Sequence, residues 1–258
     1  VVGNIDTILR KIMEATSGVV SERDIALGRL AGAYHDTVQV WREKKTIDRG
    51  FGKVVRDRSK GEDADLGHID NEKDSAILAE QFMRAANKNG DFFSDGDIQT
   101  VKLAIDATVA ARDMPNKTVR QVNLDAKSSP VETAMALADL ATAGIGGGEK
   151  FLDEGRRLFR EDNIDIFDAI NSGQEIPSDK KDYFKTRMVE FLGSQPHFAR
   201  GREARLKIEI ESLPKAAQEA VSNLFNKFAE SIEMSQEVVD KAEKEKWSFE
   251  DLAKYFRF

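Results

Sequence analysis

The 258-residue sequence contains no cysteine. This absence excludes disulfide bonds and thiolate metal sites, so histidine, aspartate and glutamate remain as the strong metal ligands. No apolar run approaches the length that a membrane-spanning helix requires, and the sequence has no internal repeat, low-complexity tract or sustained heptad. The net charge of −7 argues against bulk attraction to nucleic acid or to anionic lipid. We therefore expect neither a nucleic-acid partner nor a membrane partner.

The residues that are present are typical of a folded protein. Hydrophobic residues make up 40% of the chain and charged residues 33%, without the apolar depletion that marks disorder. The length fits one sizeable domain with an appended helical piece, and a composition without cysteine fits a cytoplasmic protein. The chain begins at Val1 without methionine or a signal-peptide pattern, which indicates a trimmed or processed form.

Apolar residues recur at helical spacing along most of the chain. Four pairs of residues resemble capping boxes at helix starts: Ser21 with Asp24, Ser94 with Asp97, Ser129 with Glu132, and Ser248 with Asp251. Thr118–Leu124 has modest strand character, but one short extended segment cannot form a sheet, so we expect coil there. The predicted fold is an irregular all-α globular domain with helices near residues 4–16, 21–41, 71–87, 94–108, 129–143, 149–160, 162–171, 178–193, 201–212, 214–233, 235–246 and 248–257.

The predicted helix Ser21–Trp41 carries the dipeptide His35-Asp36 towards its C-terminal end. Its broad apolar face indicates that the helix is buried over much of its circumference. A buried histidine beside an aspartate has two explanations. One is a core histidine that is hydrogen-bonded to its surroundings. The other is a site for a divalent metal such as Mn, Fe, Co, Ni or Zn, because imidazole and carboxylate suit these ions.

A polar connection follows at residues 41–70. Residues 42–60 contain eight lysines and arginines against three acidic residues, and acidic residues follow at positions 62, 63, 65 and 70. The connection is predicted to be either a solvated loop or a lid whose cations meet an anionic substrate. In the second case, Arg42, Lys44 and Lys45 are the candidate residues that bind the substrate phosphate.

Four motifs fall in a recognisable order: AGAYHD at 31–36, NEKDSA at 71–76, LAIDAT at 103–108 and ALADLATAG at 136–144. Together they resemble the HD superfamily of predicted metal-dependent phosphohydrolases. The stretch Arg200–Leu213 also looks like the closing helix of that superfamily. The resemblance covers residues 1–213, so it implies an HD-type helical domain there and leaves residues 214–258 as a C-terminal helical extension.

The resemblance implies an HD-type metal-dependent phosphohydrolase that acts on a phosphate monoester or a nucleotide. His35, Asp36 and Asp139 match the metal ligands of the family, and the ion would be Mn, Fe, Co, Ni, Zn or Mg. Glu72 matches the glutamate of the N-E-x-x-S-A motif and, with Asp36, is a candidate catalytic residue, because a carboxylate near the metal can orient water. The implied partner is a small phosphorylated substrate.

Several positions depart from the family pattern. Residues 1–34 contain no histidine, and Leu137 stands where the family has a first aspartate. Ala111 replaces the histidine that follows Thr108 by three residues, and both residues are expected on one face of a helix that passes the His35-Asp36 pair. These departures support an alternative, a non-catalytic all-α binding or regulatory protein without metal on a degenerate HD scaffold.

The C-terminal extension ends in an aromatic-rich segment, which comprises Trp247, Phe249, Leu252, Tyr255, Phe256 and Phe258. We interpret these side chains as core packing of a terminal helix. If the side chains are exposed instead, they form an apolar patch suited to self-association. In that case the exposed patch would indicate a homo-oligomer formed through the C-terminal helix.

Overall fold

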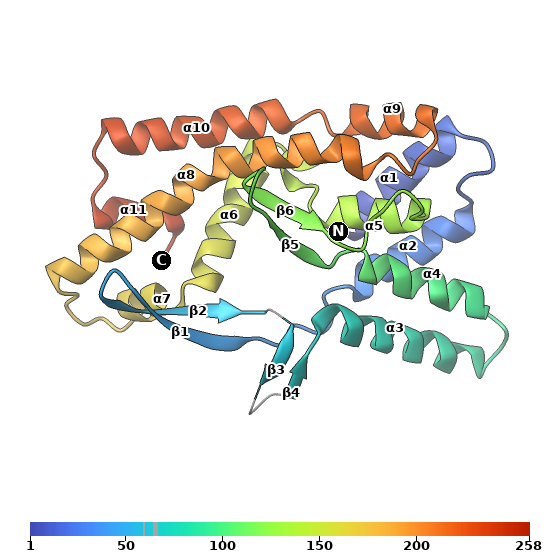
Figure 1. Cartoon of the computed structure of the whole chain (residues 1–258), viewed down its shortest axis with the longest axis horizontal. Coiled ribbons are helices and arrows are strands. Elements are labelled where there is room, and N and C mark those ends of the chain that lie inside the picture. The colour runs from blue at the N-terminus through green and yellow to red at the C-terminus, as the bar shows by residue number, and fades with distance from the viewer. Residues whose placement is uncertain (59, 64–66) are drawn as a thin grey trace.

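The computed structural model describes residues 1–58, 60–63 and 67–258 and is largely helical (Figure 1). The helices are α1 (Val2–Ala15), α2 (Glu22–Tyr34), α3 (Asn71–Asn87), α4 (Asp95–Asp106), α5 (Pro130–Asp139), the short π-helix η1 (Thr142–Gly146), α6 (Gly148–Asp162), α7 (Ile164–Asn171), α8 (Ser178–Glu209), α9 (Lys215–Leu224), α10 (Phe228–Lys244) and α11 (Phe249–Phe256). The strands are β1 (Arg42–Asp48), β2 (Phe51–Asp57), β3 (Gly61–Asp63), β4 (Gly67–Ile69), β5 (Ala110–Asp113) and β6 (Thr118–Gln121). In the described part of the chain, no helix combines the length and apolar character needed to cross a membrane.

The helix starts that the sequence predicted are confirmed at α2, α4, α5 and α11. At each start the serine side chain accepts a hydrogen bond from the third backbone N–H, and the acidic side chain accepts one from the serine backbone N–H. Each box therefore satisfies two N–H groups that the first helical turn leaves without a partner. The prediction of two helices at 178–193 and 201–212 is corrected, because α8 runs without a break through the buried Pro196.

Two clusters of buried apolar side chains hold the helices together. The first is built by α1, α2, α4 and α5, is closed by α9, and includes Ile5, Leu9 and Met135, which are fully buried. The second lies between α6, α7, α8 and α11 around Phe184 and Phe256. The 32-residue helix α8 contributes to both clusters and runs along the molecule beside α10 (Figure 1). The predicted extension at 214–258 thus supplies side chains to both cores.

The predicted loop or lid at 41–70 contains two β-hairpins instead. β1 and β2 pair antiparallel from Arg42 opposite Asp57 to Asp48 opposite Phe51, and β3 pairs with β4. The turn between β1 and β2 is Arg49-Gly50, whose φ angles of 52° and 83° are the positive values that a two-residue hairpin turn requires. The tip of this hairpin docks on α8, because the Phe51 ring stacks on a tyrosine of α8.

A third hairpin corrects two further predictions. β5 and β6 pair antiparallel, so the segment near Thr118 is a strand with a partner and not coil. Helix α4 ends at Asp106, where the Thr108 hydroxyl donates to the Ile105 carbonyl, and Ala111 lies on β5 opposite Arg120. Thr108 and Ala111 therefore do not share a helix face.

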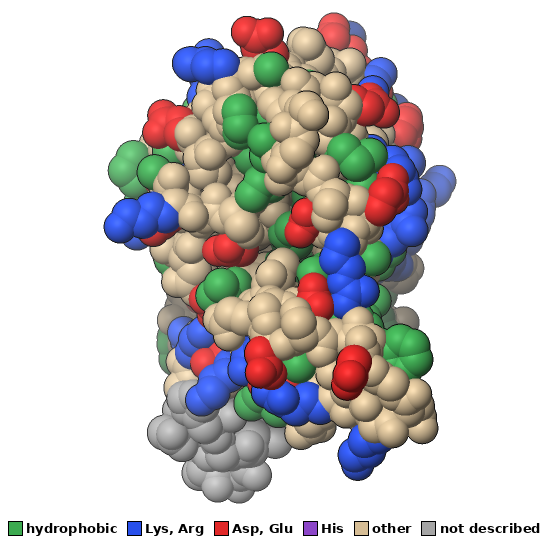
Figure 2. All heavy atoms as spheres, turned by 90° about the vertical axis from the view of Figure 1, so that its right-hand side faces the viewer, with side chains coloured by type: hydrophobic (Ala, Val, Ile, Leu, Met, Phe, Trp, Pro, Cys, Tyr) green, Lys and Arg blue, Asp and Glu red, His purple; other side chains and the backbone are tan. Residues whose placement is uncertain are grey.

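The C-terminal aromatic helix α11 packs inside the protomer. Leu252 and Phe256 are fully buried and Phe249 is 8% exposed, all within the second cluster. The exposed patch on which the predicted homo-oligomer depends is therefore not formed by these side chains. On the face seen in Figure 2, acidic and basic side chains are interspersed.

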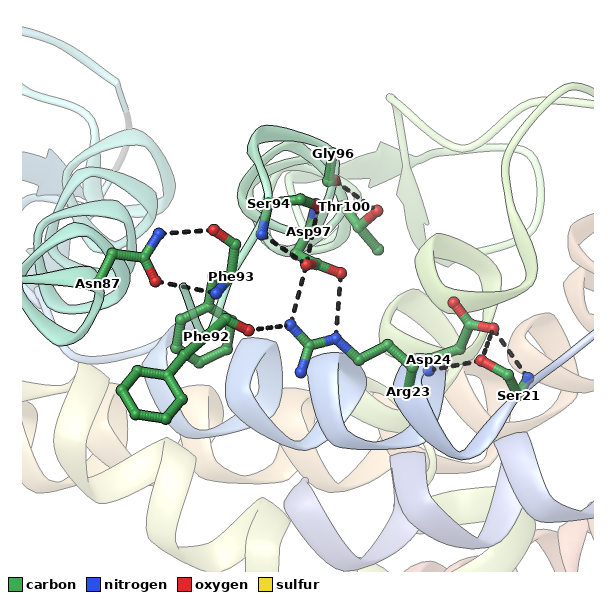
Figure 3. Close-up of polar contacts among 10 residues, drawn as sticks. All are labelled: Ser21, Arg23, Asp24, Asn87, Phe92, Phe93, Ser94, Gly96, Asp97 and Thr100. Atoms are coloured by element: carbon green, nitrogen blue, oxygen red, sulfur yellow. Dashed lines mark hydrogen bonds and ion pairs between the residues drawn. The ribbon is translucent and has the colours of Figure 1, made fainter. Parts of the chain in front are cut away.

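One polar network locks α2 against the start of α4 (Figure 3). Arg23 donates to both carboxylate oxygens of Asp97, at 3.2 and 2.9 Å, and to the Phe92 carbonyl. The Asp97 carboxylate also accepts the Ser94 backbone N–H at 2.8 Å. The contact with Arg23, followed by the hydrogen bonds from Ser94, outweighs partial burial and lowers the pKa of Asp97 to about 2.

Replacing Asp97 by alanine is expected to lower the free energy of unfolding by about 1–2 kcal/mol, because one change removes a helix cap and the partner of Arg23. Since the pKa of Asp97 falls from 3.8 to about 2 on folding, this stability is present above pH 3.8 and is lost as the pH falls through 2. Urea unfolding between pH 6 and pH 2.5 measures it. The control is Asp95→Ala, whose exposed carboxylate lies in the same turn. A difference between wild type and Asp97→Ala that stays constant with pH contradicts this account.

Candidate functional site

His35 is held at the C-terminal end of α2 with one ring nitrogen fixed. Its backbone N–H donates to the Ala31 carbonyl, and the side chain is 7% exposed. Ring atom Nδ1 lies 2.9 Å from the Gly32 carbonyl oxygen. Because a carbonyl oxygen only accepts, Nδ1 carries the hydrogen and donates it. The opposite nitrogen, Nε2, is therefore the one presented to the rest of the site.

Two aspartates meet this nitrogen. Asp36 follows His35 directly, and its Oδ2 lies 3.2 Å from Nε2. Asp139 is the last residue of α5, and its Oδ1 lies 3.4 Å from Nε2. Nε2 is buried and makes no hydrogen bond of good geometry, although both carboxylates are within ion-pair distance. The three residues that the sequence predicted as metal ligands are thus brought together from two helices far apart in the chain; we call them the triad.

The electrostatics of the triad favour a positive charge at Nε2. Burial disfavours the protonated ring, but the carboxylates of Asp139 and Asp36 outweigh burial and raise the pKa of His35 to about 10. The contact with His35 lowers the pKa of Asp36 against the opposing effect of burial, and the positive charge of Arg58 adds to the lowering. In addition, α2 and α5 both end at the site, and the C-terminal end of a helix attracts cations.

Two side chains of the N-E-x-x-S-A motif form hydrogen bonds with the backbone that follows His35 and Asp36. The Asn71 side chain accepts a hydrogen bond from the Val40 N–H at 2.9 Å and donates one to the Val40 carbonyl at 3.0 Å. The fully buried Ser75 hydroxyl accepts the Val38 N–H at 3.0 Å. The start of α3 therefore positions the chain just after His35 and Asp36, a role that the sequence did not indicate for Asn71 or Ser75.

Glu72 and the predicted phosphate-binding residues lie outside the triad, at the start of α3 and on β1. Glu72 lies in the first turn of α3 and makes no hydrogen bond or ion pair within the described part of the chain, so its catalytic role stays a prediction. Arg42 pairs with Asp57 across the β1–β2 hairpin. Lys44 and Lys45 are exposed on β1, with Lys45 close to a glutamate of the same strand.

The cation that acts on the triad is Arg58, just after β2, which the sequence did not single out. Its charge contributes to the lowered pKa of Asp36, while its guanidinium pairs with Asp162 at 3.1 Å and Glu161 at 3.7 Å at the end of α6. Its approach to Asp36 depends on the hairpin and on the packing of α6. These are long-range features that residue spacing does not reveal.

The triad offers one imidazole nitrogen and two carboxylates. An imidazole nitrogen and two carboxylates are the ligand types that Mn, Fe, Co, Ni and Zn accept. The buried Nε2, which lacks a well-formed hydrogen bond, is the atom that such an ion would bind. Among the described residues, no group of three or more histidine, aspartate or glutamate side chains is already spread around a common point as a metal site. Metal binding at the triad would therefore require loss of the His35 proton and rearrangement of the carboxylates.

Comparison of the chain with protein-family models, with curated proteins and with solved structures found no match. The functional conclusion therefore depends on the residues of this chain.

Proposed function

We propose that this protein is a metal-dependent phosphohydrolase of the HD type that acts on phosphate monoesters. The observation that supports it is that the carboxylates of Asp36 and Asp139 both approach the buried Nε2 of His35, at 3.2 and 3.4 Å. His35 and Asp139 are 104 positions apart, so no local constraint brings them together.

The residues of the chain have separate tasks in this proposal. His35 Nε2 and the carboxylates of Asp36 and Asp139 hold the ion, and the Gly32 carbonyl fixes the ring orientation through Nδ1. When bound, a divalent ion supplies Lewis-acid polarisation of the phosphate and lowers the pKa of water. Asn71 and Ser75 keep the backbone after Asp36 in place, and Arg58 adds positive charge where an anionic substrate approaches. Hydrolysis breaks the P–O ester bond and consumes one water.

Isothermal titration with MnCl₂ tests the proposal. We expect one ion per chain in the wild type and no measurable binding in His35→Gln, which keeps a similar side-chain size but loses Nε2 and its pairing with the carboxylates. Mn²⁺ at about 100 times its Kd is expected to raise the free energy of unfolding by about 2.7 kcal/mol. The control is His197→Gln, because His197 is exposed on α8. Equal titration curves for wild type and His35→Gln contradict a metal site at the triad.

A second candidate function is a non-catalytic binding or regulatory protein on the same scaffold. It is favoured by the raised pKa of His35, because a protonated ring between two carboxylates is a complete ion-paired group without metal. In that case His35→Gln lowers the free energy of unfolding, and Mn²⁺ has no effect on either protein. The same titration therefore separates the two functions.

A further inference from the structure

A cavity of about 270 Å³ lies beside Asp139, between η1, α6 and α8. Three phenylalanines contribute to its apolar walls: Phe151 of α6 and Phe198 of α8 stack with ring centroids 6.3 Å apart, and Phe191 of α8 also lines it. Gly155 of α6 also lines the cavity, and a Cβ there would meet the side-chain oxygen of Gln195, another lining residue, at 2.7 Å. The cavity therefore offers flat apolar surfaces to a ligand.

Three charged side chains line the same cavity, namely Lys117, Asp139 and Glu154. Lys117, in the turn between β5 and β6, is exposed and makes no ion pair with a described residue. Asp139 lines the cavity and also contacts His35 Nε2. One residue of the triad is thus shared between the candidate metal site and the cavity, and an unpaired cation lies nearby.

The geometry points to an aromatic phosphate monoester as the ligand, with its ring in the cavity and its phosphate facing Asp139 and Lys117. This inference rests on the proposed phosphohydrolase function, which places the phosphate at the triad. Cleavage of the P–O bond with one water then yields the aromatic alcohol and inorganic phosphate.

The size and the apolar walls of the cavity favour an aromatic ligand. An apolar cavity of about 150 Å³ accepts a benzene ring, so the larger volume here admits a bicyclic ring such as naphthalene. The hydroxyl groups of a simple sugar phosphate would lose hydrogen bonds to water against the phenylalanine walls, which is unfavourable. Aromatic rings instead gain contact with the phenylalanine side chains that line the cavity.

Binding of 1-naphthol, followed by its fluorescence, tests the cavity separately from the metal. We expect saturable binding to the wild type and a loss of about tenfold or more, equivalent to 1.4 kcal/mol, in Gly155→Leu, whose side chain fills the cavity. The control is Gly193→Leu on α8, where a Cβ meets nothing within 4 Å. If Gly155→Leu does not give the wild-type circular dichroism spectrum, Leu158→Trp replaces it, because the partly exposed Leu158 lines the same cavity.

The outcomes distinguish the two proposals. Failure of 1-naphthol to bind the wild type, or equal binding to Gly155→Leu and Leu158→Trp, overturns the inference whatever the metal result. Binding of 1-naphthol that is unchanged in His35→Gln supports the cavity as a site for an aromatic ring. If Mn²⁺ does not bind, the phosphohydrolase function and the phosphate monoester are overturned, while the cavity remains a site for an aromatic ring. With Mn²⁺ bound, a lower KM for 1-naphthyl phosphate than for methyl phosphate supports the substrate class, and equal KM values overturn it.

Discussion

Replacing Glu209 by alanine is expected to lower the free energy of unfolding by about 3–5 kcal/mol, because the change leaves a buried positive charge without its partner. Glu209 is 4% exposed and Arg202 is 3% exposed, and two hydrogen bonds of 3.0 and 2.6 Å join them. Arg202 also donates to the Val119 carbonyl, so the pair ties α8 to β6. Urea unfolding of both proteins measures the loss.

A matched control and a double variant make this expectation specific. Glu203 lies exposed on the same helix, and Glu203→Ala is expected to change the free energy of unfolding by less than about 0.5 kcal/mol. The double substitution Arg202→Met with Glu209→Leu removes both charges and is expected to recover most of the stability. A loss below about 1 kcal/mol in Glu209→Ala would mean that the carboxylate contributes no more than an exposed ion pair.

Phe256→Ala is expected to cost about 3–5 kcal/mol, since it removes a fully buried ring and leaves a cavity. The Phe256 ring lies 4.3 Å from that of Phe159 and 5.9 Å from that of Phe191, measured between centroids, so it joins α11 to α6 and α8. The control is Phe92→Ala, whose ring is 56% exposed. Thermal unfolding by circular dichroism measures both. Equal melting temperatures for Phe256→Ala and wild type would contradict the packing of α11 into the core.

Local sequence signals predicted many of the helices, and the reasons can be identified. The serine and acidic pairs at helix starts act within four residues, so spacing alone was sufficient to predict them. The contact of His35 with Asp139 was implied by the resemblance to the HD superfamily, in which the matching residues bind one ion, and the two side chains lie 3.4 Å apart.

Features that depend on distant backbone contacts were not predicted. The Asn71 contacts with Val40 span 31 positions, and the Ser75 contact with Val38 spans 37. Arg58, whose charge lowers the pKa of Asp36, follows the β1–β2 hairpin and pairs with residues of α6 that are more than 100 positions away. The available sequence signal was Gly50, because glycine readily adopts the positive φ angle of a hairpin turn, but the charge of the segment favoured a loop interpretation.

Diffraction from crystals grown with MnCl₂, measured near the manganese absorption edge, tests most directly whether the triad holds a divalent ion. We predict an anomalous peak about 2.1 Å from His35 Nε2, with carboxylate oxygens of Asp36 and Asp139 as further ligands. An absence of anomalous density at the triad, with Nε2 still within ion-pair distance of both carboxylates while Mn²⁺ occupies other positions in the crystal, would contradict the account.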